Sequence, residues 1–281
     1  MVTNNLSQKP YIIFVVVFSS IFLFCHKEVM DLDLKDLTLP IVIQGSITNF
    51  PGSHEVKISN AADYYSPGNY PQVSGATVTI EDDAGNLDLL TETEAGVYET
   101  TSIQGVPGRT YFLNVKSDNE KFAASATMPQ PIELDSLNFV KDSTNNRIYS
   151  LKCCFTDRQG VDDYCLFMVY KNGALLGNNI YIYSGEFTDG KRIDYENFDD
   201  VYFERYDTAR IIVYTLDKAM YDCFSTLNKL AEQEQEQENE EEDEESVLFN
   251  LTYYNLPSNI SKNAQGYFGA FGLKVYAAVV Q

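Results

Sequence analysis

The chain has 281 residues, of which 44% are hydrophobic and 13% aromatic, so it can bury one large core or two smaller ones. Its formal net charge is −21, with 41 Asp and Glu residues against 20 Lys and Arg residues. A surface this acidic repels phosphate backbones, which argues against nucleic acid as a partner. The aromatic residues are 20 Tyr and 17 Phe, with no Trp. Tyr and Phe favour β-strands, so the composition indicates a mainly β fold.

The N-terminus has the features of an export signal. Lys9 precedes an uncharged, apolar run from Tyr11 to Phe24. Fourteen residues in a helix extend about 21 Å, which is shorter than the ~30 Å hydrocarbon layer of a membrane. The length therefore favours a bacterial signal peptide, residues 1–25, over a permanent membrane span.

Cys25 stands directly at the end of the apolar run. This position is typical of bacterial lipoproteins, in which the signal peptide is cleaved just before a cysteine and that cysteine is acylated. We therefore expect Cys25 to be the lipidated mature N-terminus. Residues 26–38 are then expected to be a tether. The alternative is an ordinary buried cysteine in an uncleaved anchor. Phe24 stands where the lipoprotein signal peptidase prefers a small residue, which leaves that alternative open.

Residues 39–128 have the pattern of a β-sandwich domain. Ala76, Val78 and Ile80 alternate with threonines, as in a strand that is buried on one face. Turn residues follow at 82–86, where Gly85 suits a positive φ. Short strands separated by Gly, Pro and Asp turns predict an immunoglobulin-like or transthyretin-like sandwich. The expected strands are 41–47, 54–59, 76–80, 97–100, 111–115 and 122–128.

A second β-rich domain is expected at 132–281, after a connector that contains Pro129 and Pro131. Two prolines in three residues cannot continue a strand ladder and favour an extended link. The segment 165–170 is apolar throughout, as in a central strand with both faces covered, and residues 171–173 form a hairpin-type turn. The expected strands are 148–155, 164–170, 179–183 and 209–216, with a further strand that ends at Val280.

One helix is expected at 217–231, with Asp217 as its N-cap and an apolar stripe at helical spacing. The fourteen residues that follow, 232–245, contain ten acidic residues and no basic residue. Like-charge repulsion predicts that this run is a disordered, solvated loop. The alternative is a site for a cation or a basic partner, although the run lacks the ligand spacing of a calcium loop.

Four cysteines follow the signal: Cys153, Cys154, Cys165 and Cys223. They have no regular spacing and include no Cys-x-x-Cys pair, so we expect buried free thiols in preference to disulfides. Only two histidines are present, and they are far apart in the sequence, which predicts neither a metal site nor a cofactor.

Enzyme signals are weak. No Gly-x-Ser-x-Gly elbow accompanies a histidine, and therefore a Ser-His-Asp arrangement is not predicted. The carboxylate pairs at 162–163 and 199–200 leave a glycan- or peptide-directed hydrolase as the alternative, since two carboxylates across a cleft can cleave a glycosidic bond. We expect a binding protein, and the Tyr-rich segment with Tyr64, Tyr65 and Tyr70 is the candidate recognition loop.

Several motifs together resemble a family of Bacteroidota lipoproteins, domain-of-unknown-function family 4249. The similarity covers nearly the whole chain after Cys25 and includes these segments: Val29 to Leu34, Ile43 to Asn49, Pro71 to Ile80, Gly96 to Tyr98, Gly105 to Tyr111, Asp217 to Asp222, Pro257 to Ile260 and Gly266 to Phe268. Relatives carry a Gly/Asn/Pro-rich loop where this chain has its acidic run, which implies a variable surface loop.

The resemblance implies an accessory lipoprotein that is anchored by lipid in the outer membrane, on its periplasmic or its surface side. Genes of the family often lie near those of TonB-dependent nutrient receptors, so such a receptor is the implied partner. The resemblance implies no established activity and no catalytic residues.

Overall fold

A computed structural model describes residues 40–61, 70–176, 180–237, 257–262 and 264–281, with the backbone alone for 231–237. The segments outside these ranges include the expected signal, the tether and Cys25. Residues 39–281 cluster into one compact unit. Among the described residues, no helix has the length and apolar character needed to cross a membrane.

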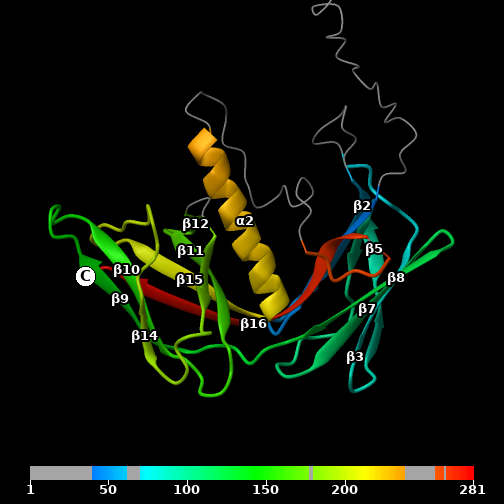
Figure 1. Ribbon diagram of the computed structural model, residues 1–281, viewed down its shortest axis with the longest axis horizontal. Coiled ribbons are helices and arrows are strands. Elements are labelled where there is room, and N and C mark those ends of the chain that lie inside the picture. The colour runs from blue at the N-terminus through cyan, green and yellow to red at the C-terminus, as the bar shows by residue number, and fades with distance from the viewer. Residues whose placement is uncertain (1–39, 62–69, 177–179, 238–256, 263) are drawn as a thin grey trace, which may run out of the picture. The chain divides into compact units, whose positions relative to one another are not determined.

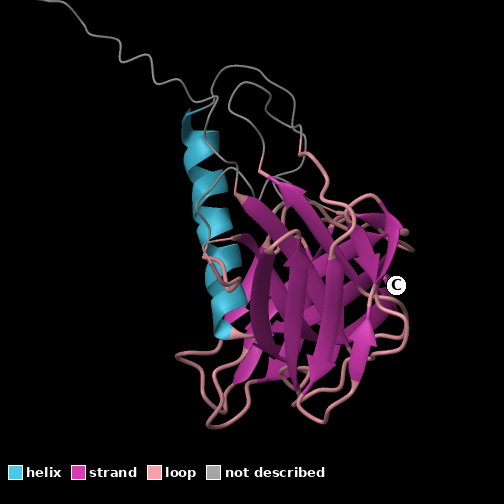
Figure 2. Ribbon diagram, turned by 90° about the vertical axis from the view of Figure 1, so that its right-hand side faces the viewer, coloured by secondary structure: helices cyan, strands magenta, loops and turns pink. Residues whose placement is uncertain are grey.

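The described part of the chain is built from three β-sheets and one helix (Figures 1 and 2), and the mainly β prediction is confirmed. The largest sheet has the order β12-β11-β15-β16-β1-β2-β6-β5, and β13 also pairs with β11. Its strands are β1 (Ile41–Thr48), β2 (Glu55–Asn60), β5 (Thr91–Glu94), β6 (Val97–Glu99), β11 (Tyr164–Lys171), β12 (Ala174–Leu175), β13 (Tyr181–Ser184), β15 (Thr208–Leu216) and β16 (Gln265–Val279).

Two smaller sheets each cover one half of this large sheet. The first has the order β4-β3-β7-β8, and the second has the order β14-β10-β9. Their strands are β3 (Thr77–Asp82), β4 (Leu87–Leu89), β7 (Thr110–Ser117), β8 (Glu120–Thr127), β9 (Leu134–Lys141), β10 (Tyr149–Thr156) and β14 (Arg192–Tyr195).

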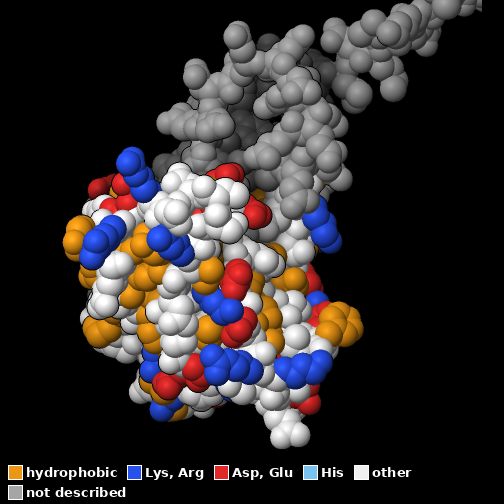
Figure 3. Space-filling view, turned by 90° about the vertical axis from the view of Figure 1, so that its left-hand side faces the viewer, with side chains coloured by type: hydrophobic (Ala, Val, Ile, Leu, Met, Phe, Trp, Pro, Cys, Tyr) orange, Lys and Arg blue, Asp and Glu red, His pale blue; other side chains and the backbone are white. Residues whose placement is uncertain are grey.

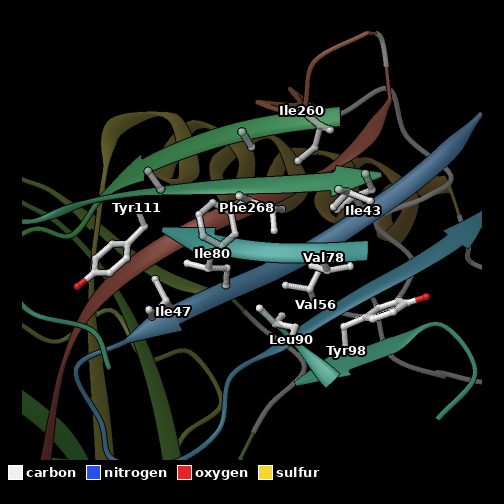
Figure 4. Close-up of a cluster of buried hydrophobic side chains, with 14 of the residues drawn as sticks. Ile43, Ile47, Val56, Val78, Ile80, Leu90, Tyr98, Tyr111, Ile260 and Phe268 are labelled. Carbon is white, nitrogen blue, oxygen red and sulfur yellow. The ribbon is translucent and has the colours of Figure 1, made fainter. Parts of the chain in front are cut away.

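The first core lies between the β4-β3-β7-β8 sheet and the half of the large sheet that contains β1, β2 and β6. Strand β3 alternates as predicted, since Val78 and Ile80 are fully buried. Two further members, Ile260 and Phe268, come from the C-terminal part of the chain (Figure 4). Phe268 lies on β16, which runs parallel to β1 and pairs Gly45 with Phe268.

The second core lies beneath the other half of the large sheet and is rich in aromatic side chains. Phe167 stacks on Tyr195 with ring centroids 4.7 Å apart, and Phe155 packs edge-on against Tyr183 at 5.0 Å. Cys153 and Cys165 also belong to this core. All four described cysteines are buried free thiols, as the sequence predicted.

The predicted division at Pro129–Pro131 falls between the two cores but does not separate their strands. Strand β16 pairs with β1 over residues 265–271 and with β15 over residues 272–279, so one continuous strand belongs to both halves. Residues 260–270, which the division assigns to a second domain, therefore complete the first core. Sequence periodicity does not reveal this, because parallel pairing joins segments more than 200 residues apart.

Gly266 permits the parallel contact between β16 and β1. Its φ is +99°, and a Cβ atom at this position would lie 2.1 Å from the carbonyl oxygen of Ile43. A side chain here would force the two strands apart, so the glycine is required for the close approach of the two backbones.

The helix α2 (Lys218–Gln237) lies along one face of the strands (Figure 2). It begins where predicted, because the Met220 N–H donates to Oδ1 of Asp217 at 2.8 Å. It ends later than the predicted residue 231, so the first part of the acidic run, 232–237, is helical and the prediction of a disordered loop is wrong there. Glu and Gln are good helix formers, and neither Gly nor Pro interrupts the helix. Residues 238–245 lie outside the described residues.

The carboxylate of Asp88 holds the turn after β6 in place. It accepts backbone N–H groups from Thr101 at 2.8 Å, Ser102 at 2.6 Å and Ile103 at 2.8 Å, and also the Thr101 hydroxyl at 2.6 Å. Burial by itself raises the pKa of Asp88, but the hydrogen bonds from Thr101, Ile103 and Ser102 outweigh it and lower the pKa to about 2.

We predict that Asp88→Asn destabilises the protein by about 2 kcal/mol at pH 7, because charge-assisted hydrogen bonds are lost. The stabilisation from Asp88 is complete above an unfolded-state pKa of about 3.9 and disappears as the pH falls towards 2. In urea unfolding between pH 7 and pH 2.5, the difference in free energy of unfolding between Asp88→Asn and the wild type should therefore become smaller as the pH falls. The exposed Glu94→Gln is the control and should match the wild type.

We also predict that Phe268→Ala costs about 3–5 kcal/mol, since the side chain is fully buried in the first core. Val275→Ala, on the same strand but 44% exposed, should cost less than about 1 kcal/mol. Because β16 is shared, we expect the protein to unfold in a single thermal transition, with the same midpoint temperature by near-UV circular dichroism and by calorimetry. Phe268→Ala should lower this midpoint temperature. A shift in only one of two separate transitions would mean that the two halves unfold independently.

Candidate functional site

A cleft of about 590 Å³ opens where α2 begins, beside the connector between the two halves. The N-terminal end of α2 is its lower end in Figure 1. The cleft is formed by the connector, the loop after β10, the turn after β13 and the junction of β15 with α2. Its lining residues are Thr127, Pro129, Arg158, Val161, Asp162, Asp163, Tyr164, Glu186, Thr215, Leu216, Asp217 and Lys218.

The connector is bonded to the large sheet, which fixes one wall of the cleft. The backbone N–H of Ile132 donates to the buried hydroxyl of Thr215 at 2.9 Å. The N–H of Leu134 donates to the hydroxyl of Tyr276 on β16 at 2.8 Å. Pro129 and Pro131 cannot donate such bonds, so the chain on either side of them supplies the attachment.

Asp217 stands at the base of the cleft and caps α2. Its Oδ1 accepts the N–H of Met220 and also the hydroxyl of Tyr267 at 3.1 Å. Burial, and then the charge of Asp217, raise the pKa of Tyr267 well above its ordinary value, so the phenol stays protonated and donates. The cap was predicted from the sequence, but its bond to Tyr267 was not.

Arg158 and Asp163 close the loop after β10. The Asp163 carboxylate is fully buried and accepts the Arg158 Nε–H at 2.9 Å and the Arg158 backbone N–H at 3.1 Å. The guanidinium Nη2 makes a further bond to Asp163 Oδ1. Several hydrogen bonds between one arginine and one carboxylate fix the geometry of the loop as well as its charge.

Lys218 organises the part of the cleft where α2 begins. Its ammonium group lies 2.9 Å from Glu186 Oε1 and 2.9 Å from Asp222 Oδ1. It also lies over the rings of Tyr164 and Tyr221, at 5.4 and 5.7 Å from their centroids, and the two rings are 4.9 Å apart. This single cation therefore joins α2, β11 and the turn after β13.

Glu186 and Tyr164 form a hydrogen-bonded pair inside this group. The Tyr164 hydroxyl donates to Glu186 Oε1 at 3.0 Å. Hydrogen bonds from Lys218 and then from Tyr164 lower the pKa of Glu186. Burial, and then Glu186, raise the pKa of Tyr164 to about 12. At neutral pH the pair is a carboxylate and a phenol, which is an arrangement that holds a fixed geometry and does not exchange protons.

Asp157 lies beneath the cleft wall and is 1% exposed. Its Oδ2 has no hydrogen-bond partner among the described residues, and Tyr183 donates to its Oδ1 over a long 3.4 Å. Gly185 packs against this carboxyl, since a Cβ there would lie 2.5 Å from Asp157 Oδ1. Burial, and then the charge of Asp163, raise the pKa of Asp157.

The residues that the sequence singled out do not gather at this cleft. Cys25, Tyr64 and Tyr65 lie outside the described residues, and Tyr70 has a buried hydroxyl with no hydrogen-bond partner in the described part of the chain. Of the two carboxylate pairs, 162–163 lines the cleft, whereas 199–200 lies in an exposed turn.

Most of the site could not be found in the sequence. Arg158, Lys218 and Glu186 lie in segments whose tertiary contacts bring them together, and no local motif marks them. The described residues contain no group of three or more His, Cys, Asp or Glu side chains placed to hold a metal ion.

Residues 27–275 match the family described as "Domain of unknown function (DUF4249)". The chain belongs to this family. The match includes the first core, most of the second core, every residue that lines the cleft, and β16 as far as residue 275. No curated protein matches the chain.

We predict opposite effects for two isosteric substitutions at the cleft wall. Asp163→Asn removes the charge that neutralises Arg158 and should cost about 1–3 kcal/mol at pH 7. Asp157→Asn removes a buried carboxyl whose raised pKa makes stability fall as the pH rises above about 4. This variant should therefore be at least as stable as the wild type at pH 7.5, with less advantage near pH 4.

Thermal unfolding between pH 4 and pH 8 tests both substitutions, with the exposed Asp162→Asn as the control. A constant loss of stability in Asp157→Asn at every pH would contradict the prediction. Such a result would show that the carboxylate is needed as a hydrogen-bond acceptor.

Proposed function

We propose that this chain is an accessory lipoprotein of the outer membrane, anchored through acylated Cys25, that binds a ligand or a protein partner and associates with a TonB-dependent nutrient receptor. The anchor rests on the apolar run that ends at Cys25 and on the lipoprotein character that the family resemblance implies. The receptor rests on the family resemblance, which makes it an analogy and not an argument from the site.

The observation that favours binding over catalysis is that three carboxylates of the cleft are already held in ion pairs or hydrogen bonds within the protein. Asp163 is bonded to Arg158, Glu186 to Lys218 and Tyr164, and Asp217 to the first turn of α2 and Tyr267. A hydrolase that uses acidic residues needs one carboxyl with a raised pKa facing another across the substrate. Glu186 has a lowered pKa, and Asp157, whose pKa is raised, is buried behind the wall.

The cleft lies away from the residue at which the described chain begins. The described chain starts at Pro40 and enters β1 at Ile41. The cleft lies beyond the other end of β1, where Thr48 pairs with Phe271 and the neighbouring Gly272 pairs with Thr215 of the cleft wall. Eight residues of strand separate these ends by roughly 26 Å.

The anchor predicts that wild-type protein incorporates labelled palmitate in a bacterial host and that Cys25→Ser does not. Cys223→Ser is the matched control, because its thiol is buried in the folded chain. It should retain the label of the wild type. Equal labelling of Cys25→Ser and the wild type would end the lipoprotein proposal.

The receptor association is tested by chemical crosslinking in the native envelope, followed by affinity capture and mass spectrometry. We expect a β-barrel transporter among the crosslinked partners of the wild type. Failure to recover one while the protein is abundant would refute this part of the proposal.

A further inference from the structure

Phe187 is the most exposed large hydrophobic residue in the described part of the chain, at 86%. It lies in the turn after β13, immediately after the cleft residue Glu186. The turn is held by backbone bonds from Thr188 to Gly185 at 3.0 Å and from Lys191 to Thr188 at 2.8 Å. The Lys191 ammonium group also donates to the Phe187 carbonyl at 3.2 Å. An apolar ring is thus presented to solvent on a rigid turn.

A second exposed hydrophobic side chain lies on the loop bonded to this turn. Val161 is 47% exposed and lines the cleft. The backbone N–H of Gly160 donates to Oδ1 of Asp189, and the N–H of Gly185 donates to the Asp163 carbonyl at 2.7 Å. The two loops therefore form one bonded rim, which we define as residues 158–163 and 185–191.

Four carboxylates of the rim, Asp162, Asp163, Glu186 and Asp189, outnumber its two cations, Arg158 and Lys191. Both cations that line the cleft are already neutralised, Arg158 by Asp163 and Lys218 by Glu186 and Asp222. The exposed Asp162 forms no ion pair with the described residues. On the side of the molecule with β9, β10 and β14, basic and acidic side chains likewise lie next to one another between hydrophobic ones (Figure 3). There Lys152 is bonded to Asp194 and Glu196.

We propose that the rim docks a basic, apolar polypeptide segment of a partner protein, with Phe187 and Val161 as apolar anchors and Asp162 as the carboxylate that receives a Lys or Arg. This inference rests on the proposed binding function and names the chemistry of its partner. Rigidly held aromatic side chains in a desolvated contact supply most of the affinity of protein interfaces. The negative surplus, in a chain of net charge −21, supplies complementarity to a basic segment.

Charge and shape favour a polypeptide over the other occupants. An anionic ligand or an anionic membrane surface is repelled by the unpaired carboxylate and the negative chain. A small amine satisfies Asp162 but leaves both apolar side chains exposed. A segment with both basic and apolar residues can contact all three groups. Val161 and Asp162 line the cleft, and Phe187 lies outside it on the bonded turn.

The test uses the chain without its N-terminal signal. Fluorescein-labelled peptides are titrated with this protein, and binding is measured by fluorescence polarisation. The probe is Gly-Lys-Leu-Gly-Lys-Leu-Gly, and its two controls replace Lys with Glu or Leu with Ser. We expect the probe to bind at least about tenfold more tightly than either control peptide.

Two rim variants measure separately how the charge and the apolar contact contribute to peptide binding. Asp162→Asn should weaken probe binding about threefold and reduce its dependence on salt. Phe187→Ser should weaken binding about fivefold or more with the salt dependence unchanged. Leu87→Ser is the matched control, because Leu87 is 63% exposed on a different sheet and should leave binding as in the wild type. All three positions are exposed, so the thermal transition of each variant should match that of the wild type.

Equal binding of the Lys and Glu peptides, no binding below about 1 mM, or equal effects of Phe187→Ser and Leu87→Ser would overturn the inference. If any of these occurs while envelope crosslinking still captures a transporter, the rim assignment fails and the proposed function stands. If the probe binds as expected but no transporter is captured, the rim stands and the receptor association fails.

Discussion

The parallel pairing of β16 with β1 is the constraint on which the rest of the structure depends. One strand of fifteen residues passes from the first core to the second, pairing with β1 in one half and with β15 in the other. Its glycines permit close contact with neighbouring chain segments: Gly266 approaches the backbone of Ile43, and Gly272 lies against Pro129 of the connector. The shared strand thereby fixes the spacing between the two halves and places the connector at the wall of the cleft.

Buried carboxylates fix the loops in place, as β16 fixes the sheets. Asp88 binds three consecutive backbone N–H groups, and Asp163 binds the backbone and side chain of Arg158. Each converts a loop that lacks regular pairing into a fixed element, because a buried carboxylate is stable only with its hydrogen bonds made. At the cleft, the same principle holds the rim that presents Phe187 in a defined place.

Local patterns predicted much of the fold. The alternation through Val78 and Ile80, the cap at Asp217 and the turn at 171–173 each depend on neighbouring residues, and all three are present in the structure. The edge strand β9 was missed, because its sequence mixes polar and apolar residues without a clear period. The cleft could not be predicted, since Arg158 and Lys218 are brought to the same cleft by contacts between distant strands, which single-sequence patterns do not encode.

The shared strand also determines the order in which the chain can fold. The ribosome synthesises the chain from its N-terminus, so β1 through β8 are complete long before residues 260–270 are added. Until then the first core lacks Ile260 and Phe268, and the β16 side of β1 has no partner. The part of the chain from β1 to β8 therefore has an unpaired, apolar strand edge during this time. Such an edge can pair with strands of other chains. Until its synthesis is complete, this chain is therefore more exposed to strand pairing with other molecules than a protein whose N-terminal sandwich closes on itself.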